Sequence, residues 1–285
     1  DVVGIRVSGG LELQRTNVVL QRAEQSRAIR ASPADVVLYD SRLEVGGGGF
    51  AWGIDYSGSG SLEELIVSRS EITVGQGSFT TGIEAYDGTI IIVSSVLDGG
   101  NPYDAAAALE VYDGSLTLRS NTLSIGSDNT SSVLTIDTLS EASVPAWIQN
   151  NILFVRGTDG GSLIDTDTLG SITFENNVLH GAGTDQIVTS SEPDGFPSTG
   201  YSDIATLEAA VATAGGTASG NADIDPFLVD PSSLAGEGDW RLSASSPAFA
   251  TTGGLDGATL DWGFDYDIEN IQRSVPWSLG AYEYT

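Results

Sequence analysis

Two aspartates stand two residues apart in the segment Asp165-Thr166-Asp167. In a β-strand, side chains two residues apart project from the same face, which would place these carboxylates ~7 Å from each other. This separation suits the carboxyl pair of an inverting glycoside hydrolase, with one group as general acid and the other as general base. Outward carboxylates are also common on solvated strands, so the pair indicates either a catalytic set or a solvated face.

A row of acidic residues recurs at one position of the repeat described below. The row, in chain order, is Arg6, Arg30, Asp55, Glu84, Glu110, Thr135 and Asp165. Stacked copies would bring Asp55, Glu84 and Glu110 to ~5 Å spacing, where like charges repel unless a cation bridges them or they splay into water. We therefore expect either a Ca²⁺ site with carboxylate ligands or a solvated acidic face. The same alternatives apply to a carboxyl-terminal set, namely Asp256, Asp261, Asp265, Asp267 and Glu269.

The elements that would position these side chains follow from a repeat of about 25 residues, of which seven copies can be aligned. One apolar column contains Ile5, Ile29, Ile54, Ile83, Leu109, Leu134 and Ile164. A second contains Leu13, Leu38, Val67, Ile92, Leu118, Ile148 and Phe174. A third contains Val18, Leu43, Ile72, Leu97, Leu123, Leu153 and Leu179. Three columns per copy predict three short strands per turn around a shared interior.

Alternation within each copy indicates strands rather than helices. Two residues before the second column the side chain is again apolar, as at Leu11 and Ile90, and this period of two is typical of strands with one buried face. Between the second and third strands a small polar residue recurs, and stacked copies would bond along a ladder. This row contains Thr16, Ser41, Ser70, Ser95, Asn121, Asn151 and Asn177. The pattern predicts an all-β, right-handed parallel β-helix of about seven turns, its handedness following from the general rule for parallel connections.

Two copies of the repeat are longer than the others. Their extra residues fall between the first and second strands, near Ser57 to Leu62 and Leu139 to Val144. Both excursions would emerge on the same edge of the rod, where insertions in solenoids often build a binding face. Tolerated surface loops are the alternative.

Composition bounds the classes of protein. The chain has 285 residues, 40% of them hydrophobic, no cysteine, and 11 basic residues, all arginine, against 39 acidic ones, which gives a formal charge of −28. This charge repels phosphate backbones and anionic lipid, so we expect no nucleic-acid partner. No stretch of 18 apolar residues exists, so we expect no membrane span. Such acidity fits an exported protein in salty or calcium-bearing surroundings, or an acidic proteome in general.

After Gly183 the columns stop, which divides the chain into β-helix repeats at 1–183 and a carboxyl-terminal capping region at 184–285. Within the capping region, Ser202 is expected to cap a short helix that ends at Gly215 and Gly216. The apolar face of this helix would contain Ile204, Leu207, Ala210 and Val211. The helix and the segment with Trp240, Trp262 and Trp277 would cover the last open turn. At the other end, Val2 begins directly in the repeat, so we expect upstream sequence or self-association at an open β edge.

Four motifs occur together near the carboxyl terminus. They are Asp223-Ile224-Asp225-Pro226-Phe227, Asp239-Trp240-Arg241-Leu242, Ser245-Ser246-Pro247-Ala248 and Leu279-Gly280-Ala281-Tyr282-Glu283. With the pairs Asn150-Asn151 and Asn176-Asn177 they resemble bacterial right-handed parallel β-helix proteins of the pectate-lyase-like superfamily, in particular the choice-of-anchor Q group related to polymorphic outer-membrane proteins. The resemblance implies an exported, often surface-attached β-helix, usually without an assigned activity. The usual Asp-Ile-Gly-Ala-Tyr-Glu ending is altered here to Ser278-Leu279-Gly280.

Enzymes on the fold of that superfamily cleave acidic polysaccharides, which implies roles for titratable and basic side chains. His180 is a candidate acid or base, although it stands beside Gly181 rather than in a Gly-His-Gly setting, and a surface turn is the alternative. Candidates for a lyase base or uronate clamp near the bend between the second and third strands are Arg69, Arg119 and Arg156. Pairing with the surplus of acids is the alternative role of these arginines.

Two classes of function follow. The first is a non-catalytic module of the cell surface or extracellular space that serves adhesion, matrix or surface assembly and binds a glycan or protein partner. The second is a carbohydrate-active enzyme, either a polysaccharide lyase or a glycoside hydrolase, for which the warrant is analogy of fold. We favour the first because no convergent catalytic set is evident in the sequence.

Overall fold

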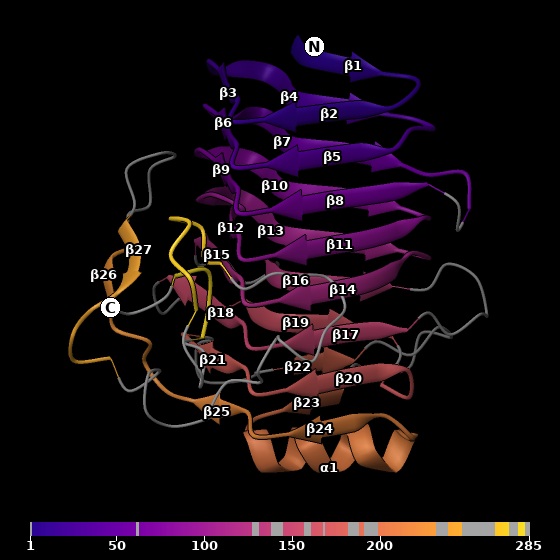
Figure 1. The fold of residues 1–285 in the computed structure, drawn as a ribbon. Coiled ribbons are helices and arrows are strands. Elements are labelled where there is room, and N and C mark those ends of the chain that lie inside the picture. The colour runs from indigo at the N-terminus through magenta and orange to yellow at the C-terminus, as the bar shows by residue number, and fades with distance from the viewer. Residues whose placement is uncertain are drawn as a thin grey trace.

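A computed structural model describes residues 2–60, 63–126, 131–137, 145–156, 161–167, 169–181, 188–190, 199–231, 239–246, 266–273 and 279–282. Within these ranges the chain winds through three parallel sheets, here called A, B and C (Figure 1). Seven successive strand triplets, from β1–β2–β3 to β19–β20–β21, are separated by six rises. Viewed from the N-terminal end the chain runs clockwise as it recedes, so the coil is right-handed, as expected (Figure 1).

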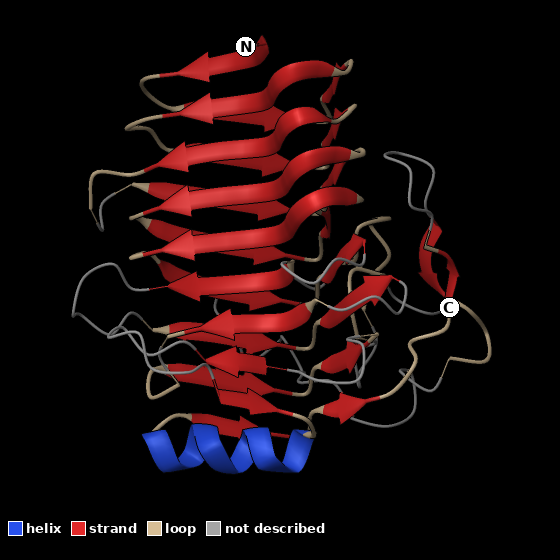
Figure 2. Ribbon diagram, turned by 180° about the vertical axis from the view of Figure 1, so that it is seen from behind, coloured by secondary structure: helices blue, strands red, loops and turns tan. Residues whose placement is uncertain are grey.

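Sheet A has nine strands and faces the viewer in Figure 2. Its strands are β1 (Val2–Val7), β4 (Ala23–Ala31), β7 (Gly48–Ser57), β10 (Gly77–Tyr86), β13 (Pro102–Tyr112), β16 (Ser132–Asp137), β19 (Ser162–Thr166), β22 (Val188–Ser190) and β23 (Thr199–Tyr201). All neighbours pair in parallel except β22 and β23, which pair antiparallel at the end of the sheet.

Sheets B and C have eight strands each. Sheet B contains β2 (Leu11–Gln14), β5 (Val36–Tyr39), β8 (Glu64–Ser68), β11 (Thr89–Val93), β14 (Ser115–Arg119), β17 (Ala146–Gln149), β20 (Ile172–Glu175) and β24 (Thr217–Ser219). Sheet C contains β3 (Asn17–Leu20), β6 (Arg42–Val45), β9 (Glu71–Val74), β12 (Val96–Asp98), β15 (Thr122–Gly126), β18 (Ile152–Arg156), β21 (Val178–His180) and β25 (Ala222–Asp223). The predicted parallel β-solenoid with three strands per turn is thus confirmed.

The register of the sheets confirms all three apolar columns. Ile54 pairs with Ile83 in sheet A, Leu38 with Val67 in sheet B, and Leu97 with Leu123 in sheet C. These side chains are fully buried in one continuous core that runs along the rod. Because each inward side chain packs on its equivalents in the turns before and after, the repeat of the sequence becomes the repeat of the core.

The polar row between sheets B and C forms the expected ladder. The amide of each member donates to the side chain of the next, for example Asn121 N to Asn151 Oδ1 at 2.9 Å and Asn151 N to Asn177 Oδ1 at 3.0 Å. The ladder begins with Thr16 N donating to Ser41 Oγ at 3.1 Å. It continues one step beyond the predicted row, because Asn177 N donates to Asn221 Oδ1 at 3.0 Å. These bonds satisfy buried amides at every bend.

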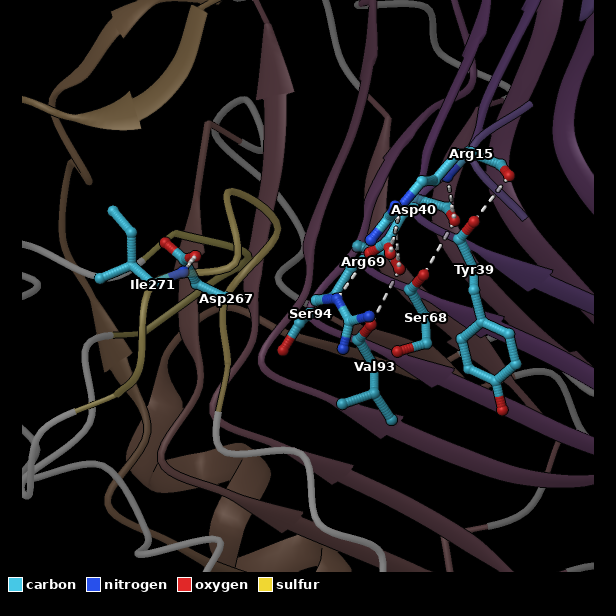
Figure 3. Close-up of polar contacts among 12 residues, drawn as sticks. Arg15, Tyr39, Asp40, Ser68, Arg69, Val93, Ser94, Asp267 and Ile271 are labelled. Atoms are coloured by element: carbon cyan, nitrogen blue, oxygen red, sulfur yellow. Dashed lines mark hydrogen bonds and ion pairs between the residues drawn. The ribbon is translucent and has the colours of Figure 1, made fainter. Parts of the chain in front are cut away.

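The residue before each ladder residue has a left-handed backbone. Its φ is 51° at Arg15, 48° at Asp40, 45° at Arg69 and 49° at Ser94, where the chain turns from sheet B to sheet C. Each of these residues donates its amide to a carbonyl of the next turn, as Arg15 N does to Tyr39 O at 3.0 Å (Figure 3). The bend therefore uses a conformation that costs ordinary residues ~1 kcal/mol, and the inter-turn bonds retain it.

The helix α1 (Ile204–Ala214) lies across the last turn (Figures 1 and 2). Its N-cap is Asp203, which accepts a hydrogen bond from Thr206 N at 2.8 Å, so the expected cap at Ser202 is wrong by one residue. Leu207 and Val211 are buried in the main core, and Gly215 ends the helix with φ of 100°. The strands β24 and β25 follow and extend sheets B and C past residue 183, an addition that the apolar columns do not reveal.

The segment after β25 packs along the outer face of sheet C. It includes the antiparallel pair β26 (Leu228–Asp230) and β27 (Asp239–Leu242). Trp240 is 2% exposed and packs with Val96 and Ala281, and Leu279 packs with Ile152. This segment therefore covers a flank of the rod in addition to the end that α1 closes. Trp262 and Trp277 lie outside the described residues.

The extra residues of the two longer repeats lie between strands of sheets A and B, as predicted. The first joins β7 to β8 and the second joins β16 to β17. Residues 61–62 and 138–144 of these connections fall outside the described ranges, so the prediction that they form a binding face stays a prediction.

Candidate functional site

A groove lies on the outer face of sheet A and crosses strands β7, β10, β13, β16 and β19, with a volume of about 470 Å³. Its lining residues are Phe50, Trp52, Phe79, Thr80, Thr81, Glu84, Ala105, Ala106, Glu110, Tyr112, Ser132, Thr135, Asp137 and Asp165. Ile83 and Leu109 point into the core, so their neighbours Glu84 and Glu110 face the opposite side, which is the groove. Cavities of this size are typical of small-molecule sites.

An aromatic platform forms one end of the groove. The rings of Phe50 and Phe79 are stacked with centroids 5.1 Å apart and planes at 9°, and Trp52 stacks on Phe50 at 6.0 Å. Phe50 is 39% exposed and Phe79 44%, so part of each ring is open to a ligand. The parallel register of β7 and β10 pairs these two phenylalanines and thereby builds the platform.

The two arginines beside the groove, Arg27 and Arg30, both pair with Asp55. The Arg27 guanidinium lies over the Trp52 ring at 4.1 Å, and its Nε is 2.7 Å from Asp55 Oδ2. Arg30 also approaches Asp55, at 3.4 Å. Asp55 thus has arginine partners, where the sequence predicted either a Ca²⁺ shared with Glu84 and Glu110 or a solvated acidic face.

Two glutamates occupy the centre of the groove. Glu84 and Glu110 are paired in the register of β10 and β13. Burial raises the pKa of Glu110 to about 7, and the charge of Glu84 adds to this rise. Burial also raises the pKa of Glu84, although the Tyr86 hydroxyl, which donates to Glu84 Oε1 at 3.0 Å, opposes this. Both effects follow from placing like charges on neighbouring strands away from bulk water.

Two tyrosines line the side of the glutamate pair. Tyr86 and Tyr112 are stacked with centroids 4.7 Å apart. Burial and the adjacent glutamates raise the pKa of both phenols, so they remain neutral hydrogen-bonding groups. The Thr81 hydroxyl completes this region by donating to Glu110 Oε2 at 3.3 Å.

One polar atom of the groove, Asp165 Oδ1, has no hydrogen-bond partner among the described residues. Burial, followed by the charge of Asp167, raises the pKa of Asp165. Thr80 Oγ1 also has no such partner, but Thr80 stands between the groove-facing Phe79 and Thr81 and pairs with the core residue Ala51, so its side chain points away from the groove. Buried polar atoms normally have partners, so the free oxygen of Asp165 is suited to a ligand that supplies a donor.

The predicted aspartate pair keeps its shared outward face, because Thr166 between the two residues is buried and the charge of Asp167 raises the pKa of Asp165. Asp165 lies in β19 and lines the groove, whereas Asp167 follows the end of that strand. Asp165 also shares its outward row with Glu110, because Thr135 pairs with both. The acids that meet in the groove therefore come from different turns.

Calcium-binding residues were the other prediction for this row. Among the described residues, no three acidic or histidine side chains are grouped closely enough to hold a metal ion. In the carboxyl-terminal set, Asp267 Oδ1 accepts a hydrogen bond from Ile271 N at 2.7 Å (Figure 3), and Glu269 lines a second pocket. Asp256, Asp261 and Asp265 lie outside the described residues.

The second pocket, of about 410 Å³, lies where the first bends meet the carboxyl-terminal segment. Arg69 belongs to it, and its Nε is 2.7 Å from Asp40 Oδ1 (Figure 3). Arg15 also reaches Asp40, at 3.9 Å. Burial raises the pKa of Glu71 in the same pocket, while the charge of Arg42 opposes the rise. Because cations and anions alternate here, the pocket has little charge left for a ligand.

The remaining candidates lie on other faces. Arg119 ends β14 in sheet B next to the bend, and burial lowers its pKa. Arg156 ends β18 in sheet C, so its expected place at the bend between the second and third strands is wrong. It forms a buried ion pair with Asp98 at 2.8 Å. His180 ends β21, stacks on Phe154 and lies 3.9 Å from both Asp223 and Asp225.

Sequence reasoning missed the groove residues Phe50, Trp52, Phe79 and Thr80. A signal existed for two of them, because Phe50 and Phe79 both stand four residues before the first apolar column. Exposure of these aromatics could not be inferred, since the long strands β7 and β10 extend beyond the part that repeats throughout the chain.

These findings define a class of protein, a parallel β-solenoid with three sheets and a groove on the outer face of sheet A. Comparisons with protein-family models, with curated proteins and with solved structures found no match to this chain. Within the described ranges, no helix combines the length and hydropathy that crossing a bilayer requires.

Proposed function

We propose that this protein is an exported or cell-surface module that binds a glycan along the sheet A groove and acts without catalysis in adhesion, matrix or surface assembly. The observation that carries the proposal is the stacked pair Phe50–Phe79 beside the acidic pair Glu84–Glu110 in one groove. The resemblance of the carboxyl-terminal motifs to the choice-of-anchor Q group supports the surface location.

The chemistry of the groove fits a sugar. A pyranose has faces of C–H groups, which pack on aromatic rings, and a rim of hydroxyl groups, which need hydrogen-bond acceptors. The platform supplies the first and the carboxyl groups of Glu84 and Asp165 supply the second. The unpartnered Asp165 Oδ1 would gain a partner from a bound hydroxyl.

The test measures binding of soluble oligosaccharides to the full chain by calorimetry. Phe79→Ala removes one ring of the platform, and we expect affinity to fall by about 10-fold, the scale of a lost aromatic contact. Trp147→Ala is the matched control, because Trp147 is similarly exposed at 39% but lies in β17 of sheet B. Equal affinity of the Phe79→Ala variant and the parent protein would contradict the proposal.

A glycoside hydrolase is the second candidate function, and one observation favours it. Glu110, with its pKa raised to about 7, would carry a proton near neutrality, and Asp165 lies two strands further along the same row. At ~4.8 Å per strand the two backbones are ~10 Å apart, near the range of an inverting acid and base. No arginine is among the described lining residues, so hydrolysis fits better than lyase chemistry.

A direct assay separates these two candidates. The protein is incubated with neutral and charged oligosaccharides, and new reducing ends are measured over a day. A binding module releases none. Turnover that is lost in Glu110→Gln and Asp165→Asn would establish the hydrolase instead.

A further inference from the structure

The groove on sheet A is acidic throughout. The charged side chains among its described lining residues are Glu84, Glu110, Asp137 and Asp165, and no basic residue lines it. The nearest arginines that the structure places beside it, Arg27 and Arg30, are paired with Asp55. The whole chain adds a formal charge of −28. A polyanionic glycan entering this groove would meet repulsion from the acids on β10, β13, β16 and β19.

Two observations besides the acidic charge point to a ligand in the groove. Asp165, on the outward row of β19, lines the groove and has an oxygen, Oδ1, with no partner among the described residues. The platform of Phe50 and Phe79 holds two stacked rings in an exposed position beside the acids. Aromatic faces attract cations as well as sugar C–H groups.

Resting on the proposed glycan-binding function, we infer that the ligand is a glycan that carries free amino groups, such as an oligomer of 2-amino-2-deoxyglucose. Its protonated amines would lie between Glu84 and Glu110 and its rings on Phe50 and Phe79. An ammonium group offers three donors, which match the carboxylate oxygens of this pair. A cation in this place relieves the like-charge repulsion between adjacent strands.

Binding would also move a proton. The raised pKa of Glu110 means that its carboxyl group is largely protonated at slightly acidic pH. The other titratable groups that face it are Glu84 and Tyr86 on β10, Tyr112 on its own strand, and Asp137 and Asp165 on β16 and β19. An ammonium beside Glu110 favours its charged form, so binding should release a proton to the buffer.

The test measures, by calorimetry at about pH 6 and low salt, the binding of three oligosaccharides of different charge to the full chain. They are a glucosamine hexamer, its fully N-acetylated counterpart and a galacturonate hexamer. We expect the glucosamine hexamer to bind at least about 10-fold more tightly than the N-acetylated one, and the galacturonate hexamer most weakly. Repeating the titration in buffers of different ionisation enthalpy should show proton release for the glucosamine hexamer.

The double variant Glu84→Gln/Glu110→Gln tests the residues. It should lose both the preference for free amines and the proton release while it keeps binding to the N-acetylated hexamer through the platform. A melting curve checks that this near-isosteric variant is folded, and Trp147→Ala serves again as the unaffected control.

The outcomes separate the two proposals. If the N-acetylated hexamer binds as well as or better than the amine form, the inference is overturned while the glycan-binding function stands. If none of the oligosaccharides binds, the proposed function falls and the inference with it. If an oligolysine of equal charge binds as tightly as the glucosamine hexamer and Phe79→Ala changes neither affinity, the groove recognises charge alone and the inference is overturned.

Discussion

Glu84 and Glu110 face each other across two neighbouring strands of sheet A, in direct register and on the groove side of the sheet. Few arrangements in a sheet are less favourable than two carboxylates directly opposite one another. The protein tolerates the pair because Tyr86 and Thr81 donate hydrogen bonds to it and because a raised pKa lets Glu110 keep its proton. This relationship has a direct consequence for stability.

Replacing Glu110 by Gln should stabilise the protein in a pH-dependent way. The folded protein holds the Glu110 proton more tightly than the unfolded chain, since its pKa is about 7 against 4.5 for an ordinary glutamate. The contribution of the protonated Glu110 to the free energy of unfolding is therefore fully present below about pH 4.5 and is lost as pH rises through 7. We expect Glu110→Gln to match the parent near pH 4.5 and to exceed it by on the order of 3 kcal/mol at pH 8.

Urea unfolding at both pH values measures this difference in the free energy of unfolding. Glu12→Gln is the control, because Glu12 is exposed on β2. An advantage of Glu110→Gln that is the same at both pH values would show that the effect comes from packing rather than from titration.

Removing one side chain of the polar ladder should lower the free energy of unfolding by more than the small size of that side chain suggests. Asn151 accepts from Asn121 N at 2.9 Å and donates to Leu118 O at 2.9 Å, and it is fully buried. Asn151→Ala leaves both groups buried without a partner, so we expect a loss of about 2–5 kcal/mol. Asn17→Ala, on the exposed face of β3, should change stability by less than about 0.5 kcal/mol. Similar losses in the two variants, measured by urea unfolding, would contradict the structural importance of the ladder.

The buried ion pair under the carboxyl-terminal segment should respond asymmetrically to substitution. Asp98 is 1% exposed and pairs with Arg156, whose guanidinium lies 5.6 Å from the Trp240 ring. Arg156→Leu leaves a buried carboxylate uncompensated, with an expected loss of about 3–5 kcal/mol, and Asp98→Asn in the same chain should recover most of it. Tryptophan fluorescence during unfolding reports the change.

A surface pair provides the control for that experiment. Arg241 pairs with Asp239 on β27, and its side chain is 55% exposed. Arg241→Leu should cost at most about 1 kcal/mol. The argument fails if this exposed pair matters as much as Asp98–Arg156, or if the double variant is no better than Arg156→Leu.

Two buried serines at successive positions of the bend should respond in opposite directions to glycine. Ser120 has φ of 54° and a hydroxyl with no hydrogen-bond partner among the described residues. Ser120→Gly removes the backbone strain and the unsatisfied oxygen, and we expect a gain of about 0.5–1 kcal/mol after the entropy of glycine is subtracted. Ser95→Gly instead deletes a ladder side chain that accepts from Ser70 N at 3.1 Å, so it should destabilise. Melting temperatures of the two variants measured side by side check the sign.

The sequence by itself determined the parallel solenoid, its three sheets and the register of every turn. Ile54, Ile83 and Leu109 could be aligned without a structure because each inward position meets the same position of the next turn, so burial imposes one repeating constraint. The same argument placed Asn121, Asn151 and Asn177 in a ladder. It also placed Glu84 beside Glu110, although not the aromatic platform or the groove around them.

The tertiary structure alone decided what the outward side chains meet. Asp98 and Arg156 lie on strands separated by a whole turn, and the segment with Trp240 that covers them comes from far along the chain. Such contacts occur only once along the rod, so the periodicity of the sequence cannot predict them. Whether an outward carboxylate is solvated, paired or enclosed depends on how strands bend and on which segment packs over them. For that reason Asp55 is paired with arginine, whereas Glu110 and Asp165 line one groove.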